Sequence, residues 1–137
     1  MSNPNQRPSV VYPLAVEIPP QAALAAAGVR TSAWVAVPAD ARWAIVQLLT
    51  GALGGGSEQV DLEQATDIGG TGAKALKTGV IAGANVDNTM TDGESSLDSD
   101  LDYNNNFAFV RAKITNTGGT GAFVAVALRF GPAAFMS

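Results

Sequence analysis

The amino-acid sequence predicts an all-β protein, an antiparallel β-sandwich of jelly-roll-like type, built as a single domain with an N-terminal arm. Apolar residues alternate with small or polar residues at a period of two in several runs, which is typical of half-buried strands. Stretches rich in Gly and Pro separate these runs and predict turns between strands. The 137 residues are enough for one domain with its own core. We therefore place an extended arm at residues 1–8 and the sandwich domain at residues 9–137.

The first elements of the chain are an arm, a strand and a short Ala-rich segment. Residues 1–8 combine Pro, Asn, Gln and Arg, a composition that does not fold alone, so we expect a neighbouring subunit or a partner to hold the arm. The alternative is an arm folded back on its own sandwich. Residues 9–18 form the next predicted strand, which two consecutive prolines end. Residues 21–28 favour helix, but so short a segment supports one or two turns at most.

Three pairs of runs show strand patterns on both sides of a turn sequence, and each pair predicts a hairpin. The predicted hairpins join residues 32–37 with 41–50, 58–65 with 73–82, and 107–115 with 122–130, of which the last has the clearest pattern. In the run 41–50, alternation places Ala44, Val46 and Leu48 on one face and Trp43, Ile45, Gln47 and Leu49 on the other. The polar and acidic residues 85–106 predict a long surface loop or short edge elements.

Composition excludes several kinds of chemistry. The chain has no Cys and no His, which rules out a thiolate nucleophile, a Ser-His-Asp triad and a zinc site built on Cys or His. With 8 basic residues against 12 acidic ones, it is a poor candidate for direct nucleic-acid binding. No apolar stretch is long enough to span a bilayer. We therefore expect no cofactor, no nucleic acid, no membrane association and no enzymatic activity.

The charge is spread unevenly along the chain. Residues 1–57 have a net charge of +1, residues 58–110 of −8, and residues 111–137 of +3. The basic end and the acidic middle are expected to pair, either within one subunit or between neighbouring subunits.

Residues 69–74, Gly-Gly-Thr-Gly-Ala-Lys, have some features of a phosphate-binding loop. That motif requires Gly-Lys-Ser/Thr between a strand and a helix. Here Lys74 stands one place late, no hydroxyl residue follows it, and the next run has a strand pattern. These residues therefore predict a hairpin turn.

Asp98, Asp100 and Asp102 are spaced by two, and oxygen ligands at this spacing can surround a calcium ion. The helix-loop-helix calcium motif is rejected because Tyr103 and Phe109 occupy the positions where it needs Gly and Glu. An irregular calcium site stays open beside the simpler interpretation, a solvated edge segment, and we assign no metal ligand.

Two further patterns have a binding or catalytic interpretation. Trp34 and Trp43 provide a possible sugar-stacking platform, but their small apolar neighbours favour core or interface packing. The acids lie in polar surroundings, which does not favour a catalytic carboxylate pair for glycoside hydrolysis. We assign no catalytic residue.

Two segments, residues 60–76 (Val-Asp-Leu-Glu-Gln-Ala-Thr-Asp-Ile-Gly-Gly-Thr-Gly-Ala-Lys-Ala-Leu) and 101–112 (Leu-Asp-Tyr-Asn-Asn-Asn-Phe-Ala-Phe-Val-Arg-Ala), resemble small structural proteins of tailed bacteriophages. In those proteins a Gln-Ala-Thr-Asp, Gly-rich, Ala-Lys segment precedes a Leu-Asp, Asn-rich, Phe, Val strand entry. The resemblance covers residues 43–130 at most and implies a virion surface protein of the head decoration, or cement, type.

The leading hypothesis is a non-enzymatic protein that binds the outside of an icosahedral phage capsid and stabilises it. Its partners are then the major capsid protein and copies of itself, and its location is the virion. The alternative is a receptor- or carbohydrate-binding module of a tail fibre or spike. Because apolar contacts are not screened by salt, we expect attachment through β-edges and through Tyr12, Pro13, Phe135 and Met136.

Overall fold

The structure, a computed structural model, describes residues 14–18, 28–51, 56–84, 89–117 and 124–132. The elements within these residues are β1 (Leu14–Ile18), β2 (Val29–Thr31), β3 (Val35–Ala36), β4 (Ala41–Thr50), β5 (Ser57–Ala65), β6 (Lys74–Ala84), β7 (Met90–Ser96), α2 (Leu97–Asp100), the 3₁₀ turn η1 (Tyr103–Asn105), β8 (Phe109–Thr117) and β9 (Val124–Pro132). Strands therefore dominate, and the all-β prediction is confirmed.

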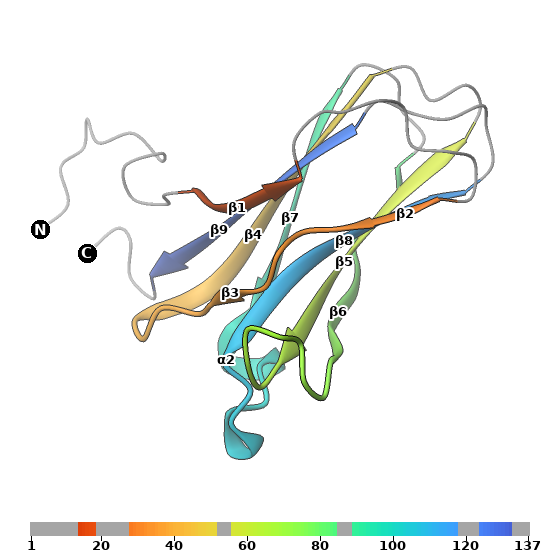
Figure 1. The fold of residues 1–137 in the computed structure, drawn as a ribbon. Helices are drawn as coiled ribbons and strands as arrows, with labels where there is room; N and C mark the ends of the chain where they lie inside the picture. Colours follow the sequence, from red (N-terminus) through yellow and green to blue (C-terminus); the bar gives the residue numbers. More distant parts are fainter. Residues whose placement is uncertain (1–13, 19–27, 52–55, 85–88, 118–123, 133–137) are drawn as a thin grey trace, which may run out of the picture.

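The strands form two antiparallel sheets that pack face to face (Figure 1). One sheet has the order β1-β9-β4-β7, and we call it the β4 sheet. The other has the order β2-β8-β5-β6, with β3 also paired to β8, and we call it the β5 sheet. The predicted antiparallel sandwich is confirmed.

The pairing is nested, which explains the topology. β5 pairs with β6, β4 with β7, β2 and β3 with β8, and β1 with β9. The chain thus resembles one long hairpin whose tip is the turn at residues 66–73. Rolling this hairpin places β4 beside β9 and β5 beside β8, which closes the two sheets into the arrangement of a jelly roll.

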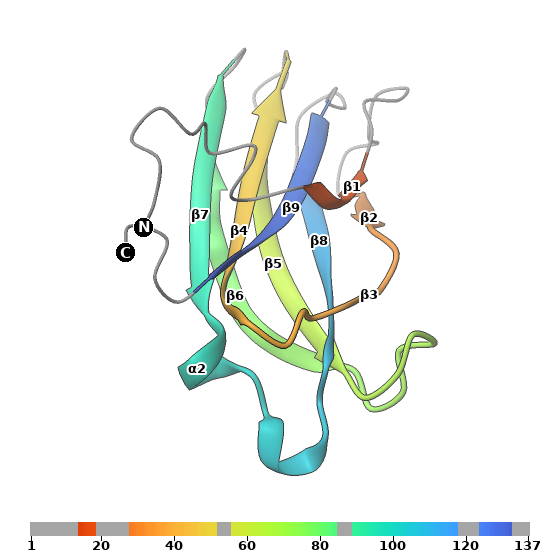
Figure 2. The same ribbon diagram turned by 90° about the vertical axis from the view of Figure 1, so that its left-hand side faces the viewer.

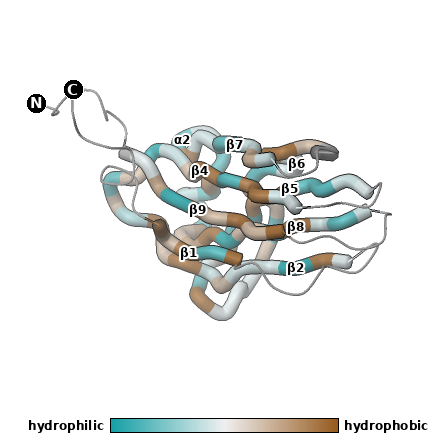
Figure 3. The backbone as a smooth tube through the Cα atoms, turned by 90° about the horizontal axis from the view of Figure 1, so that it is seen from above, coloured by the Kyte–Doolittle hydropathy of each residue, from teal (hydrophilic) through white to brown (hydrophobic). Residues whose placement is uncertain are grey.

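The core lies between the two sheets and is formed by alternate residues of the strands. Hydrophobic residues (brown) and hydrophilic residues (teal) follow each other along the strands in Figure 3. On β4, Ala44, Val46 and Leu48 are fully buried, while Trp43 and Leu49 of the opposite face are exposed. The buried apolar residues of the other central strands are Val60 and Leu62 of β5, Val110, Ala112 and Ile114 of β8, and Val124, Val126, Leu128 and Phe130 of β9. The predicted faces of β4 are confirmed, and the other central strands bury alternate residues in the same way.

Two of the three predicted hairpins are wrong, although their strands exist. β8 and β9 lie in different sheets, and so do β3 and β4, so neither pair is hydrogen-bonded. Only the pairing of β5 with β6 is confirmed. The reason is physical: alternation shows which face of a strand is buried, but a strand can bury that face equally well beside its chain neighbour or across the sandwich.

The polar segment before β8 forms the short edge elements that the sequence allowed. β7 is an edge strand of the β4 sheet, and α2 and η1 follow it. Figures 1 and 2 both show α2 at the same end of the sandwich as the turn between β5 and β6. Of the predicted strand at residues 9–18, residues 14–18 form β1; the short helix predicted at residues 21–28 lies outside the described residues except for Gly28.

Candidate interaction surface

The residues predicted to make the attachment interface, Tyr12, Pro13, Phe135 and Met136, lie outside the described residues. The described residues hold two other kinds of place for a functional site, the outer surfaces of the two sheets and the polar clusters around them.

Neither tryptophan belongs to the buried core, so the prediction of core packing is wrong for both. Trp34 is half-buried on the outside of the β5 sheet, where the Arg111 guanidinium lies 4.5 Å from its ring centroid. Gly70 lies so close to the Trp34 indole that a Cβ at this position would be 2.6 Å from Nε1. Trp34 thus packs the β5–β6 turn against the sheet, whereas Trp43 is 37% exposed on the outer face of the β4 sheet. Interface packing of Trp43 stays a prediction.

The outer face of the β4 sheet carries exposed apolar side chains in register. Leu49 is 52% exposed and stands opposite Met90, which is 64% exposed. The side chains on this face form cross-strand rows. The rows, from one end, hold Trp43; Glu94, Ile45 and Arg129; Asp92, Gln47 and Ala127; and Met90, Leu49 and Ala125. Apolar side chains clustered on one exposed sheet face are typical of an interaction surface.

A shallow hollow lies on this face over β4 and the edge strand β7. Its volume is about 370 Å³, and it is lined by Ile45, Gln47, Asp92, Gly93 and Glu94. The Arg129 guanidinium donates a 2.6 Å hydrogen bond to Gln47 Oε1, and the amide NH₂ of Gln47 is a further hydrogen-bond donor at the hollow. The surface therefore combines one apolar row, of Met90, Leu49 and Ala125, with two mixed rows and an acidic edge on β7.

The three aspartates considered for calcium are engaged by separate protein partners. Asp98 forms an exposed ion pair with Arg42 (2.8 Å), and Asp100 accepts a 2.6 Å hydrogen bond from Ser95 Oγ. Asp102 binds Lys74 Nζ at 2.5 Å. Within the described parts of the chain, no three acidic side chains are grouped as a metal site would need. This arrangement favours a structural role for the segment.

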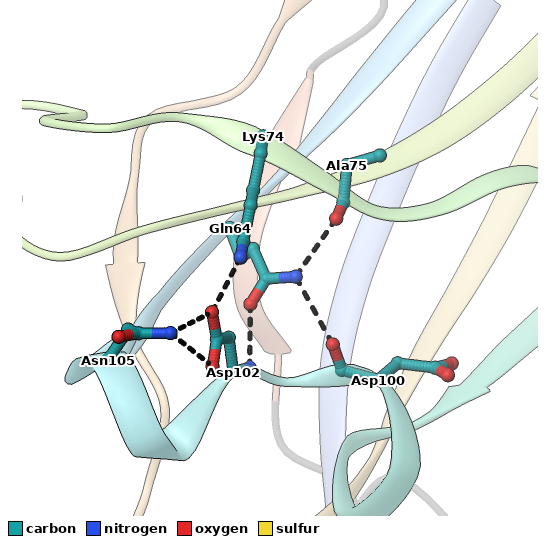
Figure 4. Close-up of polar contacts among 6 residues, drawn as sticks. All are labelled: Gln64, Lys74, Ala75, Asp100, Asp102 and Asn105. Atoms are coloured by element: carbon teal, nitrogen blue, oxygen red, sulfur yellow. Dashed lines mark hydrogen bonds and ion pairs between the residues drawn. The ribbon is translucent and has the colours of Figure 1, made fainter.

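Asp102 is held from several sides, as Figure 4 shows. Asn105 Nδ2 donates to both of its carboxylate oxygens, at 3.1 and 2.9 Å. The hydrogen bond from Lys74, followed by that from Asn105, holds the pKa of Asp102 below its ordinary value. The Lys74 ammonium also lies 4.4 Å from the ring centroid of Phe107. These contacts join the start of β6 to the segment between α2 and β8.

Gln64 is the buried centre of this cluster (Figure 4). Its Nε2 donates to the carbonyl oxygens of Ala75 (2.9 Å) and Asp100 (3.1 Å), and its Oε1 accepts from the Asp102 amide (2.8 Å). One side chain thus satisfies three backbone groups from two segments. Sequence analysis missed it, although alternation along 58–65 already placed it on the face of Val60 and Leu62.

Replacing Gln64 by Leu is expected to lower the free energy of unfolding by about 2–4 kcal/mol, because three backbone groups lose a buried partner. Urea denaturation measures the change. Gln59→Leu is the control on the same strand, since Gln59 bonds only the nearby Asp61 side chain among the bonds described here, and it should change stability by less than about 1 kcal/mol. Equal losses for both variants would contradict the structural role of Gln64.

The glycine-rich motif after β5 is a turn, as predicted. Asp67 Oδ1 accepts hydrogen bonds from the Gly69 and Thr71 amides (2.9 and 3.1 Å), and its Oδ2 accepts one from Thr71 Oγ1 at 2.6 Å. The bonds from Thr71 hold the pKa of Asp67 below its ordinary value. The turn therefore uses its own polar groups to fold, and the strand β6 follows it as predicted.

Glu58 is the second polar residue that sequence analysis missed. Its side chain is fully buried between the sheets, in register with Asn116 of β8. Among the described residues, no hydrogen-bond donor reaches either carboxylate oxygen. Burial raises the pKa of Glu58 to about 7. Because this carboxyl is sealed from solvent, it has no access to a substrate in this structure.

Comparison with known proteins does not identify the chain: no family model matches it, and no curated protein matches it. In the described residues, no helix is both long and apolar enough to cross a membrane.

Proposed function

We propose that this protein is a non-enzymatic structural component of a phage virion, which binds the outside of the icosahedral capsid and stabilises it. The observation that carries the proposal is the outer face of the β4 sheet, where Trp43, Leu49 and Met90 are exposed on neighbouring strands in regular register. Such a face can attach to a capsid through its contact area and through the many copies of the protein on one particle. Many copies, each burying a modest apolar patch, attach firmly to a lattice of capsid subunits.

The other polar groups of the described structure also favour a structural role over a catalytic one. The acidic segment before β8 is bonded to β5 and β6 through Gln64, Asp102 and Lys74. The carboxyl with a raised pKa, Glu58, is closed between the sheets. The partners would be the major capsid protein and copies of this chain, and the location would be the virion surface.

The alternative function, a receptor- or carbohydrate-binding module of a tail fibre or spike, has one observation in its favour. Trp43 is exposed on the face that holds the hollow, and the polar side chains of Gln47 and Glu94 line that hollow. Aromatic faces beside planar polar groups bind sugars by stacking and hydrogen bonding. Glycan-array binding together with absence from purified heads would favour this alternative over capsid attachment.

The direct test is co-purification of the protein with DNA-filled particles at a fixed stoichiometry. Recombinant protein added to particles that lack it should restore the same stoichiometry, and the bound protein should survive molar salt because apolar contacts are not screened. Loss of the protein in high salt would contradict apolar attachment.

The double variant Leu49→Ser with Met90→Ser is expected to weaken binding to particles at least about tenfold, because burying each apolar side chain contributes roughly 1.5–3 kcal/mol. The matched control is Val29→Ser, which changes a residue of similar exposure (54%) on β2 of the opposite sheet. Titration of particle occupancy measures both. If Val29→Ser weakens binding and the double variant does not, attachment uses the β5 sheet.

A further inference from the structure

A buried polar pair lies at the end of the sandwich where β5 starts and β8 ends, which is the end opposite α2 in Figure 1. Glu58 of β5 and Asn116 of β8 stand directly opposite each other there, and both are fully buried. Val60 and Ile114 occupy the next inward positions of the same two strands and are apolar. A carboxyl and a carboxamide therefore face each other where the adjoining core is apolar.

The register brings these two side chains close together. The backbone amide of Asn116 donates a 2.8 Å hydrogen bond to the Gly28 carbonyl oxygen, on the side of β8 that faces away from β5. Glu58 and Asn116 are therefore a non-hydrogen-bonded pair, the kind in which opposite Cβ atoms come closest within the usual range of about 4.5–5.5 Å. A hydrogen bond between the two side chains thus requires no movement of the strands.

Only the protonated form of Glu58 can donate such a bond. A carboxylate accepts hydrogen bonds and donates none, whereas a protonated carboxyl has an O–H group that the amide oxygen of Asn116 can accept. No described donor, the Asn116 side chain included, reaches either carboxylate oxygen. An ionised Glu58 in this position is therefore a buried charge without a described hydrogen bond, which is costly.

The described groups around Glu58 do not include a second titrating side chain. Arg30 of β2 faces the same interior but keeps its charge at every pH considered, and the described ion pairs do not join it to Glu58. Lys77 of β6 is exposed and bonds the Glu94 carbonyl oxygen, and Asp87 lies outside the described residues. Burial is thus the cause that raises the pKa of Glu58 to about 7. The side chains that β4, β6, β8 and β9 present to this end of the core carry no charge: Thr50, Ile81, Ile114, Val124 and Val126.

The strand end that carries Glu58 can open without unfolding of the domain. Glu58 is the second residue of β5 (Ser57–Ala65), and Asn116 is the last but one of β8 (Phe109–Thr117). The pairing of β5 with β6 also shifts its register between Glu58 and Val60. Strand ends open at a lower free energy than strand centres. Separation of this end alone is therefore enough to bring the carboxyl of Glu58 into water.

We infer that Glu58 and Asn116 form a proton-dependent latch between β5 and β8. The protonated carboxyl bonds the Asn116 amide oxygen and holds this end of the sandwich closed. When Glu58 gives its proton to solvent, the bond is lost and the carboxylate becomes hydrated as the strand end opens. The latch is a property of the single subunit and does not depend on the proposed function.

Amide hydrogen exchange locates the opening. Gln59 and Thr115 form the hydrogen-bonded pair next to the latch, and Asp61 and Lys113 form one at the centre of the same strands. Between pH 5 and 7 the protection factors of the Gln59 and Thr115 amides are expected to fall about tenfold per pH unit, because opening releases one proton. Low concentrations of urea should not accelerate their exchange but should accelerate that of Asp61 and Lys113, because urea promotes openings that expose much surface. Equal urea dependence of both pairs would show unfolding of the whole domain and would overturn the inference.

Glu58→Gln tests whether Glu58 is the titrating group. The carboxamide of Gln donates a hydrogen bond at every pH, so the protection factors of the Gln59 and Thr115 amides should be the same at pH 5 and pH 8. Glu63→Gln is the matched control, since Glu63 points outward on the same strand, and it should keep the wild-type pH dependence. A pH dependence that persists in Glu58→Gln would assign the effect to another group and would overturn the latch.

Asn116→Ala tests the other half of the latch. At pH 5 the loss of the acceptor should lower the protection factor of the Gln59 amide roughly fivefold, the value of one net hydrogen bond. At pH 8 the same variant should have little effect, because the wild-type latch is already open. Equal losses at both pH values would show that Asn116 only fills space, and its place in the latch would be wrong.

Discussion

Replacing Glu58 by Gln is expected to raise the free energy of unfolding at pH 8 by about 3 kcal/mol. Glu58 is fully buried, and burial raises its pKa from 4.5 to about 7. At pH 8 folding costs free energy at this carboxyl in either of two ways. The native chain ionises a buried carboxyl that has no described hydrogen-bond donor, or it takes up a proton that the unfolded chain does not hold. Each unit of pKa difference between the two states corresponds to about 1.4 kcal/mol, and Gln removes this cost.

The pH dependence of this effect has a defined sign. Below pH 4.5 the carboxyl is protonated in both states, so wild type and Glu58→Gln should differ little. As the pH rises from about 4.5 to 7, the unfolded chain loses the proton while the folded chain keeps it, and wild-type stability falls. Above about pH 7 the difference levels off. The carboxyls of Asp67 and Asp102, whose pKa values are lowered, lose their stabilising effect only at lower pH.

Urea denaturation between pH 4.5 and 8 measures the difference. Glu63→Gln is the control on the same strand, since Glu63 points outward and pairs with Arg111 at 2.8 Å. It should give no gain at pH 8. A Glu58→Gln variant less stable than wild type at pH 8 would show that a cation pairs with the ionised Glu58 and would contradict the prediction.

Gly93→Ala is expected to lower the free energy of unfolding by about 3 kcal/mol. Gly93 lies in β7 opposite Val46, on the inner face, and a Cβ there would be 2.3 Å from the Val80 carbonyl oxygen and 2.9 Å from Ile81 Cγ1. The first obstacle is backbone, so the edges of the two sheets must move apart to admit a methyl group. Overpacking of this kind typically costs about 1–3 kcal/mol, and rigid backbone contacts lie at the upper end.

This prediction opposes the one from strand propensity, which ranks Ala above Gly within a strand by about 0.5–1 kcal/mol. Thermal and urea denaturation distinguish the two. Gly69→Ala is the control: the nearest atom to its Cβ is Asp67 Oδ1 at 3.3 Å, the end of a side chain, and the expected change is below about 1 kcal/mol. If Gly93→Ala is as stable as wild type, the close approach of β6 and β7 does not constrain this position.

The strand faces could be predicted because alternation depends on the chain alone. In β4 and β9 each inward apolar residue stands two positions from the next, and burial follows that spacing. The β5–β6 hairpin was also predictable, since Asp67 and Thr71 fold its turn through bonds within a few residues. Glu58 and Gln64 show the limit: alternation placed both on the inner face, but a polar residue on an inner face has no evident partner until the sheets are assembled.

The all-β class, the central strands and the faces that they bury follow from the sequence, because these properties depend on the period of apolar residues and on local turn chemistry. Which strands are neighbours depends on the packing of the whole chain, as β8 and β9 show by lying in different sheets. This packing also decides that Gln64 has three backbone partners, that Glu58 has no described donor, and that Trp43 faces solvent. The physical reason is that these outcomes depend on contacts between residues far apart in the chain, which form only when the nested hairpin rolls into two packed sheets.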